Sequence, residues 1–284
     1  MGQIAILAVL LAAILALLAE APKRFLRKLF EMHPRWMLAV PVLLTGIFCG
    51  SGALAGAFSL RLALLVLAYT TLPVLSAYAR LDILTILFLW LPLEFSAGAS
   101  LVPRAAQGFL HSTAYGIAIL LALIIFTGFR PLPGMKYNLP SRAADYWLPF
   151  AAFAICAPIL ALGGIAIGFI PPIHAPVQST GRMLSAAGLI FVGTALPEEI
   201  LFRSLIQNLL MRRFGSTARV LFIAAFIFGC AHLDNGPQPL PNWRYMILAT
   251  IAGVAYGIVF GRASSVVSSA TLHMLVDWTK HFFF

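Results

Sequence analysis

Charged side chains are scarce in this sequence. Of its 284 residues only 10% are Asp, Glu, Lys or Arg, whereas 61% are hydrophobic and the mean hydropathy is +0.96. Soluble domains average about a quarter charged residues. The scarcity therefore excludes a soluble globular protein and predicts an integral membrane protein that crosses the bilayer many times.

Several patterns that define other chemistries are also missing. The sequence contains no H-E-x-x-H, the zinc-binding helix of many metalloproteases, and no G-x-S-x-G nucleophile elbow. Its three cysteines, Cys49, Cys156 and Cys230, lack the spacing of a disulfide framework or a metal finger. We read them as small apolar side chains inside helices. No internal repeat of the kind found in many transporters is present.

What is present is a series of apolar runs with the length of membrane helices. They predict an all-α, polytopic membrane helix bundle of about ten transmembrane helices, with no β-sheet. Residues 1–183 form a first region of about six helices without a recognisable motif, and residues 184–284 form a second region with the remaining four. The ten runs are 2–20, 37–57, 62–79, 83–101, 107–129, 148–170, 184–211, 218–233, 244–261 and 265–284.

The net charge of +10 reflects membrane topology rather than nucleic-acid binding. Thirteen of the 19 Lys and Arg residues fall in alternate connections, beginning with the one after the first helix, and five fall in the others or near the C-terminus. Basic residues collect on the cytoplasmic side. We therefore expect both termini to be non-cytoplasmic. The membrane is expected to be a bacterial-type plasma membrane. The lipid bilayer is the expected partner, and nucleic acid is not.

Three charged residues lie close together inside the seventh predicted helix, in the segment "ALPEEILFRSLIQNLL". An ionised group at the bilayer centre costs about 2.5–3.5 kcal/mol, so these side chains must face one another or a polar cavity. Glu199 and Arg203 are four residues apart on one stripe of the helix and can form an ion pair. Glu198 is rotated by about 100° from them. We expect Glu198 to serve a separate, chemical purpose.

Two histidines follow on later helices. His232 closes "FIFGCAH", and His273 lies four residues before Asp277 in "TLHMLVD". A carboxylate one turn away can fix the tautomer of an imidazole. A carboxylate and two imidazoles on three helices suit the activation of water and the stabilisation of an oxyanion. A histidine in a membrane helix can also be a simple interhelical hydrogen bonder.

These residues occur in a familiar order. "EEILFR" at 198–203 fits E-E-x-x-x-R, "FGCAH" at 228–232 fits F-x-x-x-H with Phe228 as its aromatic residue, and "HMLVD" at 273–277 fits H-x-x-x-N/D. Together they resemble the CAAX prenyl endopeptidase and bacteriocin-processing family of intramembrane proteases, also called the Ras-converting or abortive-infection family. The resemblance covers roughly residues 184–280.

The resemblance implies a glutamate-dependent intramembrane endopeptidase whose site is reached from the cytoplasm and whose substrate is a membrane-anchored protein or peptide. Glu198 and His232 would then activate the attacking water, while His273 and residue 277 would form the oxyanion site. Residue 277 is Asp, where the prenyl-processing members have Asn. An ionised Asp cannot donate a hydrogen bond. We therefore expect Asp277 to orient and charge His273, which alone donates.

Other interpretations stay open at this point. Glu198, His232, His273 and Asp277 contain the nitrogen and oxygen donors of a possible zinc site, although we favour no tightly bound metal or other cofactor. The same buried residues could form the relay of a proton-coupled transporter. A non-catalytic membrane scaffold that keeps the motif for folding is a further alternative. Cleavage that depends on Glu198 distinguishes the protease from both.

Overall fold

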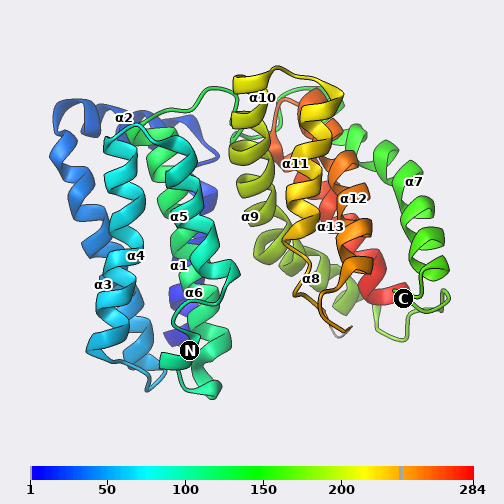
Figure 1. The fold of residues 1–284 in the computed structure, drawn as a ribbon, viewed down its shortest axis with the longest axis horizontal. Coiled ribbons are helices and arrows are strands. Elements are labelled where there is room, and N and C mark those ends of the chain that lie inside the picture. The colour runs from blue at the N-terminus through cyan, green and yellow to red at the C-terminus, as the bar shows by residue number, and fades with distance from the viewer. Residues whose placement is uncertain (1, 237–238) are drawn as a thin grey trace. The chain divides into compact units, whose positions relative to one another are not determined.

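The chain is entirely helical in the part that the computed structural model describes, residues 2–236 and 239–284. This confirms the predicted all-α class. The helices form two compact units, Met1–Pro133 and Gly134–Phe284 (Figure 1). The boundary precedes the one expected near residue 183, because α7 (Ala143–Ala166) packs against α12 (Trp243–Arg262) and α13 (Val266–Phe283). The helix expected at 148–170 thus belongs to the unit that carries the charged motif.

The first unit is built from six α-helices. Helix α3 packs on α4 and α6, and α1 packs on α6. Apolar side chains on these faces, such as Ile117 and Leu121, are completely buried. The helices are α1 (Gly2–Ala16), α2 (Glu20–Met32), α3 (Ala39–Leu54), α4 (Leu60–Tyr78), α5 (Asp82–Glu94) and α6 (Arg104–Leu123), the last continued by a π-helical turn, Ile124–Phe129.

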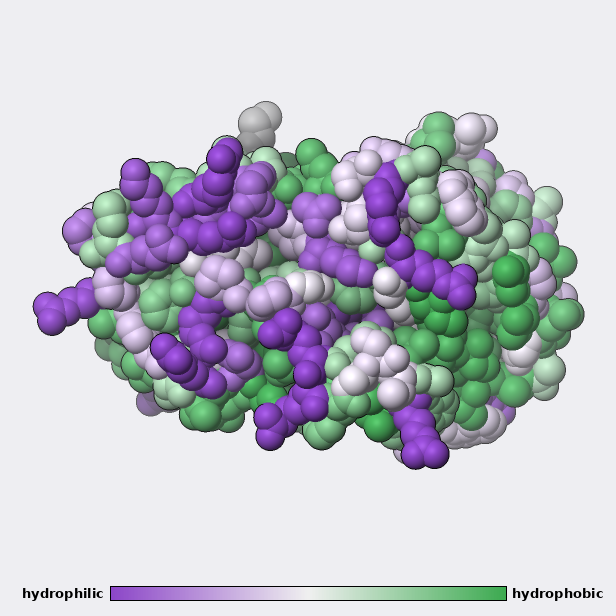
Figure 2. All heavy atoms as spheres, turned by 90° about the horizontal axis from the view of Figure 1, so that it is seen from above, coloured by the Kyte–Doolittle hydropathy of each residue, from purple (hydrophilic) through white to green (hydrophobic). Residues whose placement is uncertain are grey.

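Helix α2 covers most of the segment between the first two predicted membrane helices, which the sequence predicts to be a connection. It makes an angle of 87° with α1 and carries basic residues. Lys23 and Arg27 pair with Glu20 at 3.0 Å and 2.9 Å, and Arg27 Nε also donates to the Thr127 carbonyl at 2.9 Å. Figure 2 shows hydrophilic side chains gathered over this helix. The segment therefore has the character of a helix that lies along the membrane surface.

The second unit contains α7, a long bent helix and three further helices. The long helix spans Thr180–Phe214 and includes α8, α9 and α10. Two π-helical stretches, Phe191–Ala195 and Ile200–Gln207, flank α9. The bounds are α8 (Thr180–Ile190), α9 (Leu196–Glu199), α10 (Asn208–Phe214), α11 (Ala218–Cys230), α12 (Trp243–Arg262) and α13 (Val266–Phe283).

The π-helical stretches explain how a helix bearing Pro197 and two glutamates remains continuous. Proline lacks an N–H and clashes with the preceding turn, which normally kinks or breaks a helix. Here the backbone widens on both sides of α9, so Glu198 and Glu199 lie between two π-helical stretches and Arg203 lies within the second. Wide turns of this kind are frequent at functional sites.

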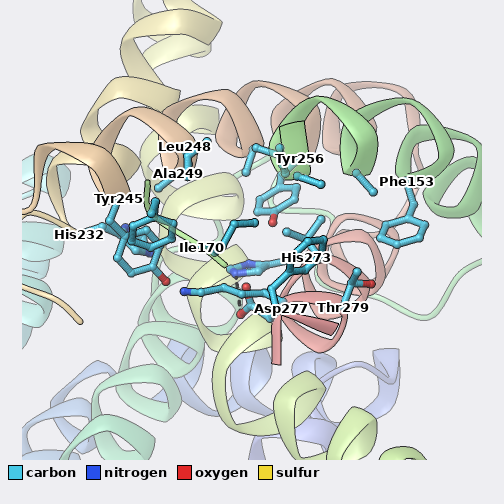
Figure 3. A pocket seen from close by; sticks show the side chains of 18 of the residues that line it. Phe153, Ile170, His232, Tyr245, Leu248, Ala249, Tyr256, His273, Asp277 and Thr279 are labelled. Atoms are coloured by element: carbon cyan, nitrogen blue, oxygen red, sulfur yellow. Dashed lines mark ion pairs between the residues drawn. The ribbon is translucent and has the colours of Figure 1, made fainter. Parts of the chain in front are cut away.

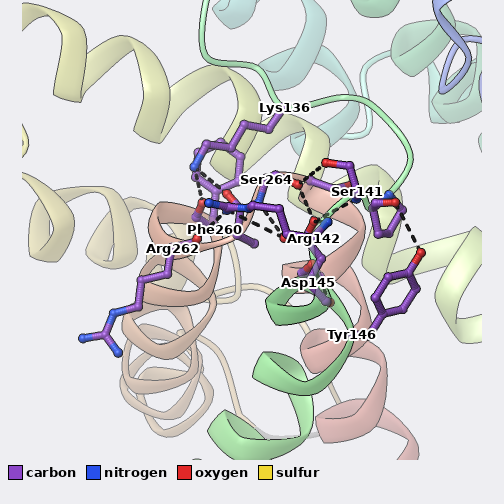
Figure 4. A network of polar contacts seen from close by, with 12 residues as sticks. Lys136, Ser141, Arg142, Asp145, Tyr146, Phe260, Arg262 and Ser264 are labelled. Atoms are coloured by element: carbon purple, nitrogen blue, oxygen red, sulfur yellow. Dashed lines mark hydrogen bonds and ion pairs between the residues drawn. The ribbon is translucent and has the colours of Figure 1, made fainter.

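A polar network fastens α7 to the turn between α12 and α13 (Figure 4). Lys136 Nζ donates to the carbonyl groups of Phe260 and Ala263 at 2.6 Å and 2.9 Å, near the C-terminus of α12. Asp145, in the first turn of α7, accepts from the backbone N–H of Ser264 at 2.7 Å and from the Ser264 hydroxyl. The network therefore connects the start of α7, the end of α12 and the start of α13 at one end of the second unit.

Six helical segments are long and apolar enough to cross a membrane, or seven if the bent pair α1 and α2 counts as one. The protein is thus an integral membrane protein. Two helices expected to cross, α5 and α11, have only 13 residues each. Length and composition therefore identify fewer spans among the described residues than the ten apolar runs suggested.

Candidate active site

His273 is the centre of the charged motif. Its Nδ1 lies 3.2 Å from Glu199 Oε1, its Nε2 lies 3.4 Å from Asp277 Oδ2, and the same Nε2 lies 3.8 Å from Glu198 Oε2. The imidazole is buried in α13. Two carboxylates from α9 and one from α13 therefore surround one ring. A ring protonated on both nitrogens can donate a hydrogen bond on each side.

Glu199 joins this ring to a buried cation. Arg203 Nε donates to Glu199 Oε2 at 3.1 Å, and both side chains are fully buried. The guanidinium lies 4.9 Å from the centroid of the Phe228 ring, so an aromatic face covers it. The expected contact between Glu199 and Arg203 is present, but Glu199 also holds His273, which the sequence did not indicate.

Glu198 differs from its neighbour in accessibility. Its side chain is 21% exposed, whereas that of Glu199 is inaccessible. The difference follows from helix geometry, since consecutive residues point about 100° apart. Glu198 is therefore the more accessible carboxylate of the pair, while its Oε2, the oxygen that faces His273 Nε2, is itself buried.

His232 lies in the turn that follows α11, because that helix ends at Cys230. Its Nδ1 is 2.9 Å from the Phe228 carbonyl oxygen, so Nδ1 carries the hydrogen and Nε2 is left as an acceptor. Gly229 brings this turn close to α12, since a Cβ atom there would lie 2.6 Å from the Met246 carbonyl oxygen. The ring packs against Phe228 and Tyr245, with centroids 4.7 Å and 4.6 Å away.

His232 and His273 line one cavity of about 80 Å³ in the second unit (Figure 3). Asp277 also lines it, whereas Glu198 reaches the site through the Nε2 edge of His273. Liquid water occupies about 30 Å³ per molecule. The cavity therefore has room and polar partners for a small number of waters. The structure brings the two imidazoles and Asp277 together around this space.

The cavity lies toward one end of the second unit. Its lining includes Phe169 and Ile170, which follow α7, Tyr245 at the start of α12, and Lys280 near the end of α13. The basic residues that end α10 and α12, and the network around Lys136, lie at the opposite ends of these helices. The cavity and the basic end of the unit are thus on different sides.

Three polar lining residues were not recognised from the sequence. Lys280 Nζ lies 4.3 Å from the Tyr245 ring centroid and 4.8 Å from that of Phe169. Tyr256 packs its ring on His273, with centroids 4.6 Å apart. The i, i+3 spacing from Asp277 was a signal for Lys280. The sequence carries no such signal for the two tyrosines, because they lie in an apolar helix and no charged residue lies three or four positions from either of them.

The described residues contain no group of three or more His, Cys, Asp or Glu side chains arranged to hold a metal ion. The absence of a tightly bound metal stays a prediction. Outside this unit, Trp90 Nε1 donates to Glu94 at 2.8 Å, and His111 stacks on Tyr115. Each contact joins two side chains of the same helix, α5 and α6 respectively.

The second unit thus brings two buried imidazoles and three carboxylates together among its helices. Residues 180–279 match the family described as type II CAAX prenyl endopeptidase Rce1-like. This part of the chain is therefore an Rce1-like domain of a membrane protease family, and such proteases act on peptides or proteins. No curated protein and no solved structure matches the chain.

Proposed function

We propose that the chain is a glutamate-dependent intramembrane endopeptidase that hydrolyses a peptide bond in a membrane-associated protein or peptide. The observation that carries this proposal is the position of His273, which faces Glu198 and Asp277 with one nitrogen and lines a cavity together with His232. The Rce1-like match supports the same class of reaction.

In the proposed reaction, a water molecule lies at the edge of the cavity beside His273 Nε2, where His232 Nε2 and Glu198 hold it. Glu198 takes a proton as the water oxygen bonds to the carbonyl carbon, and the carbonyl π electrons move to its oxygen. His273 Nε2 donates a hydrogen bond to that oxyanion. When the C–N bond breaks, the proton held by Glu198 passes to the leaving amine, which restores the carboxylate.

Asp277 acts in this scheme through His273. Its Oδ2 lies 3.4 Å from Nε2, and Glu199 holds Nδ1 from the other side. The two carboxylates favour an imidazole that carries hydrogen on both nitrogens. Asp277 is thus a positioning residue that keeps His273 ready to donate. The contact at 3.4 Å is long for a hydrogen bond, so Nε2–H is left to donate to an incoming oxyanion.

We also propose that α1, α5, α11 and α13 cross the bilayer and complete ten passes, with both termini non-cytoplasmic in a bacterial-type plasma membrane. The basic connections support this orientation. Because the cavity lies away from the basic end of the second unit, it would open toward the non-cytoplasmic side. This differs from the cytoplasmic access that the family resemblance implies, and it favours a substrate anchored at the outer face.

A comparison of membrane proteomes tests the proposed activity. Cells that contain the parent protein should accumulate a peptide fragment that is absent from cells with Glu198→Ala. Glu31→Ala, which removes an exposed carboxylate from α2, serves as the matched control and should give the parent's fragments. If the Glu198→Ala and parent proteomes contain the same fragments, the proposal is wrong.

A further inference from the structure

The proposed oxyanion site has one donor where such sites commonly use two. Both ring nitrogens of His273 face carboxylates, and because Glu199 occupies Nδ1 at 3.2 Å, only Nε2 is left to donate to a substrate. The side chain one turn further along α13 is Asp277, and an ionised carboxylate donates nothing. A tetrahedral intermediate at this site would therefore lack a second hydrogen-bond donor unless another residue supplies it.

Tyr256 of α12 is a further lining residue of the cavity, and its side chain carries a hydroxyl donor. Its ring stacks on that of His273, with centroids 4.6 Å apart and an angle of 21° between the planes. The residue lines the same cavity as His232 and is only 2% exposed. Figure 3 shows its hydroxyl pointing toward the side on which His273 lies. Among the described residues, none forms a hydrogen bond with this hydroxyl, so it is available to a ligand in the cavity.

The packing of α12 fixes the orientation of this tyrosine. Gly253 and Gly257 lie one turn before and one residue after it, and a Cβ atom at either position would press on a neighbouring helix. At Gly253 it would lie 3.1 Å from the Phe228 ring, and at Gly257 2.5 Å from Leu221. The close approach of α11 and α12 thus holds the Tyr256 ring against both Phe228 and His273, whose rings also contact each other. A donor held in this way needs little reorganisation during the reaction.

We propose that the Tyr256 hydroxyl is the second donor to the oxyanion, beside His273 Nε2. The proposal rests on the endopeptidase function proposed above. As the water adds to the carbonyl carbon, the phenolic O–H donates a hydrogen bond to the negative oxygen and keeps its proton throughout. Tyr256 thereby supplies the hydrogen bond that Asp277 cannot give. It is a catalytic residue, because it touches the reacting atoms.

Tyr256→Phe tests the assignment, since it removes one oxygen and keeps the ring that packs on His273. The assay uses purified full-length protein in lipid vesicles and a fluorogenic peptide that spans the cleavage site found by the proteome comparison. Loss of one oxyanion donor typically lowers kcat about 10²–10³-fold. We expect this loss with an unchanged KM. Tyr146→Phe is the matched control, because that tyrosine is exposed on α7 and its hydroxyl meets only the Pro140 carbonyl.

The outcomes separate this proposal from the one on which it depends. A Tyr256→Phe enzyme with the kcat of Tyr146→Phe overturns the role of Tyr256, while inactivity of Glu198→Gln in the same assay keeps the protease function. A raised KM with unchanged kcat also overturns it, because the hydroxyl would then bind the ground state. If no Glu198-dependent cleavage exists, both proposals fall. Thermal unfolding of each variant verifies that the fold is retained.

Discussion

Glu199 Oε1 lies 3.2 Å from His273 Nδ1, a contact between side chains 74 positions apart in the chain. The two adjacent glutamates differ in their contacts and in their exposure. Glu199 is inaccessible and holds both Arg203 and His273, whereas Glu198 is accessible and reaches the other edge of the same imidazole. Glu199 therefore holds the imidazole and the guanidinium together, and Glu198 faces the opposite edge of the same ring.

The first prediction concerns stability. Glu199→Gln should lower the free energy of unfolding by about 3–5 kcal/mol, because it leaves the buried Arg203 guanidinium without its counter-ion. Denaturant unfolding in detergent micelles measures the change. Glu31→Gln, at an exposed position, should stay within about 0.5 kcal/mol of the parent. Equal stabilities for the two variants would show that the ion pair does not support the fold.

His232→Gln should slow cleavage by about 10²–10⁴-fold, because the water loses the Nε2 acceptor that orients it. The single-turnover rate on the fluorogenic peptide measures this step. His281→Gln is the control, since His281 is exposed near the end of α13. The role proposed for His232 is excluded if its variant and the control cleave at the same rate.

Asp277→Asn separates a charged positioning group from a neutral one of equal size. We expect kcat to fall and KM to stay constant, because His273 loses one of the three carboxylates that face its nitrogens. Steady-state kinetics on the purified variant provide the test. Activity at neutral pH equal to or above the parent's would mean that the carboxylate is not required.

The proposed orientation predicts which cysteines an impermeant maleimide can reach. Val177→Cys, exposed in the connection after α7, should label in intact spheroplasts. Arg213→Cys, in the last turn of α10, should label only after permeabilisation. The unsubstituted protein gives the background from its native cysteines. The reverse pattern would place the cavity on the cytoplasmic side.

Much of the architecture follows from the sequence, because hydropathy alone predicts an all-helical membrane protein. Helical spacing also predicts the pair of Glu199 and Arg203, since residues four apart share a face. The contact of Glu199 with His273 is different, because it depends on the register between α9 and α13. A single sequence carries no signal for that register. Tyr256 was missed for the same reason.

The irregular parts of the chain also could not be predicted from hydrophobic periodicity. Pro197 indicated a disturbance in the helix, but the π-helical turns on both sides of α9 depend on how the surrounding helices hold the backbone. The charges of α2 interrupt the apolar pattern, so the sequence predicts a connection there. Its basic residues are nevertheless well suited to a helix at the membrane surface.

The central claim is that Glu198 activates the attacking water, and Glu198→Gln tests it most directly. The variant keeps the size and a carbonyl oxygen of the side chain but cannot take a proton. In a single-turnover assay with the purified protein, we predict a rate about 10²–10⁴-fold below the parent's with an unchanged unfolding temperature. A rate within about threefold of the parent's would contradict the account.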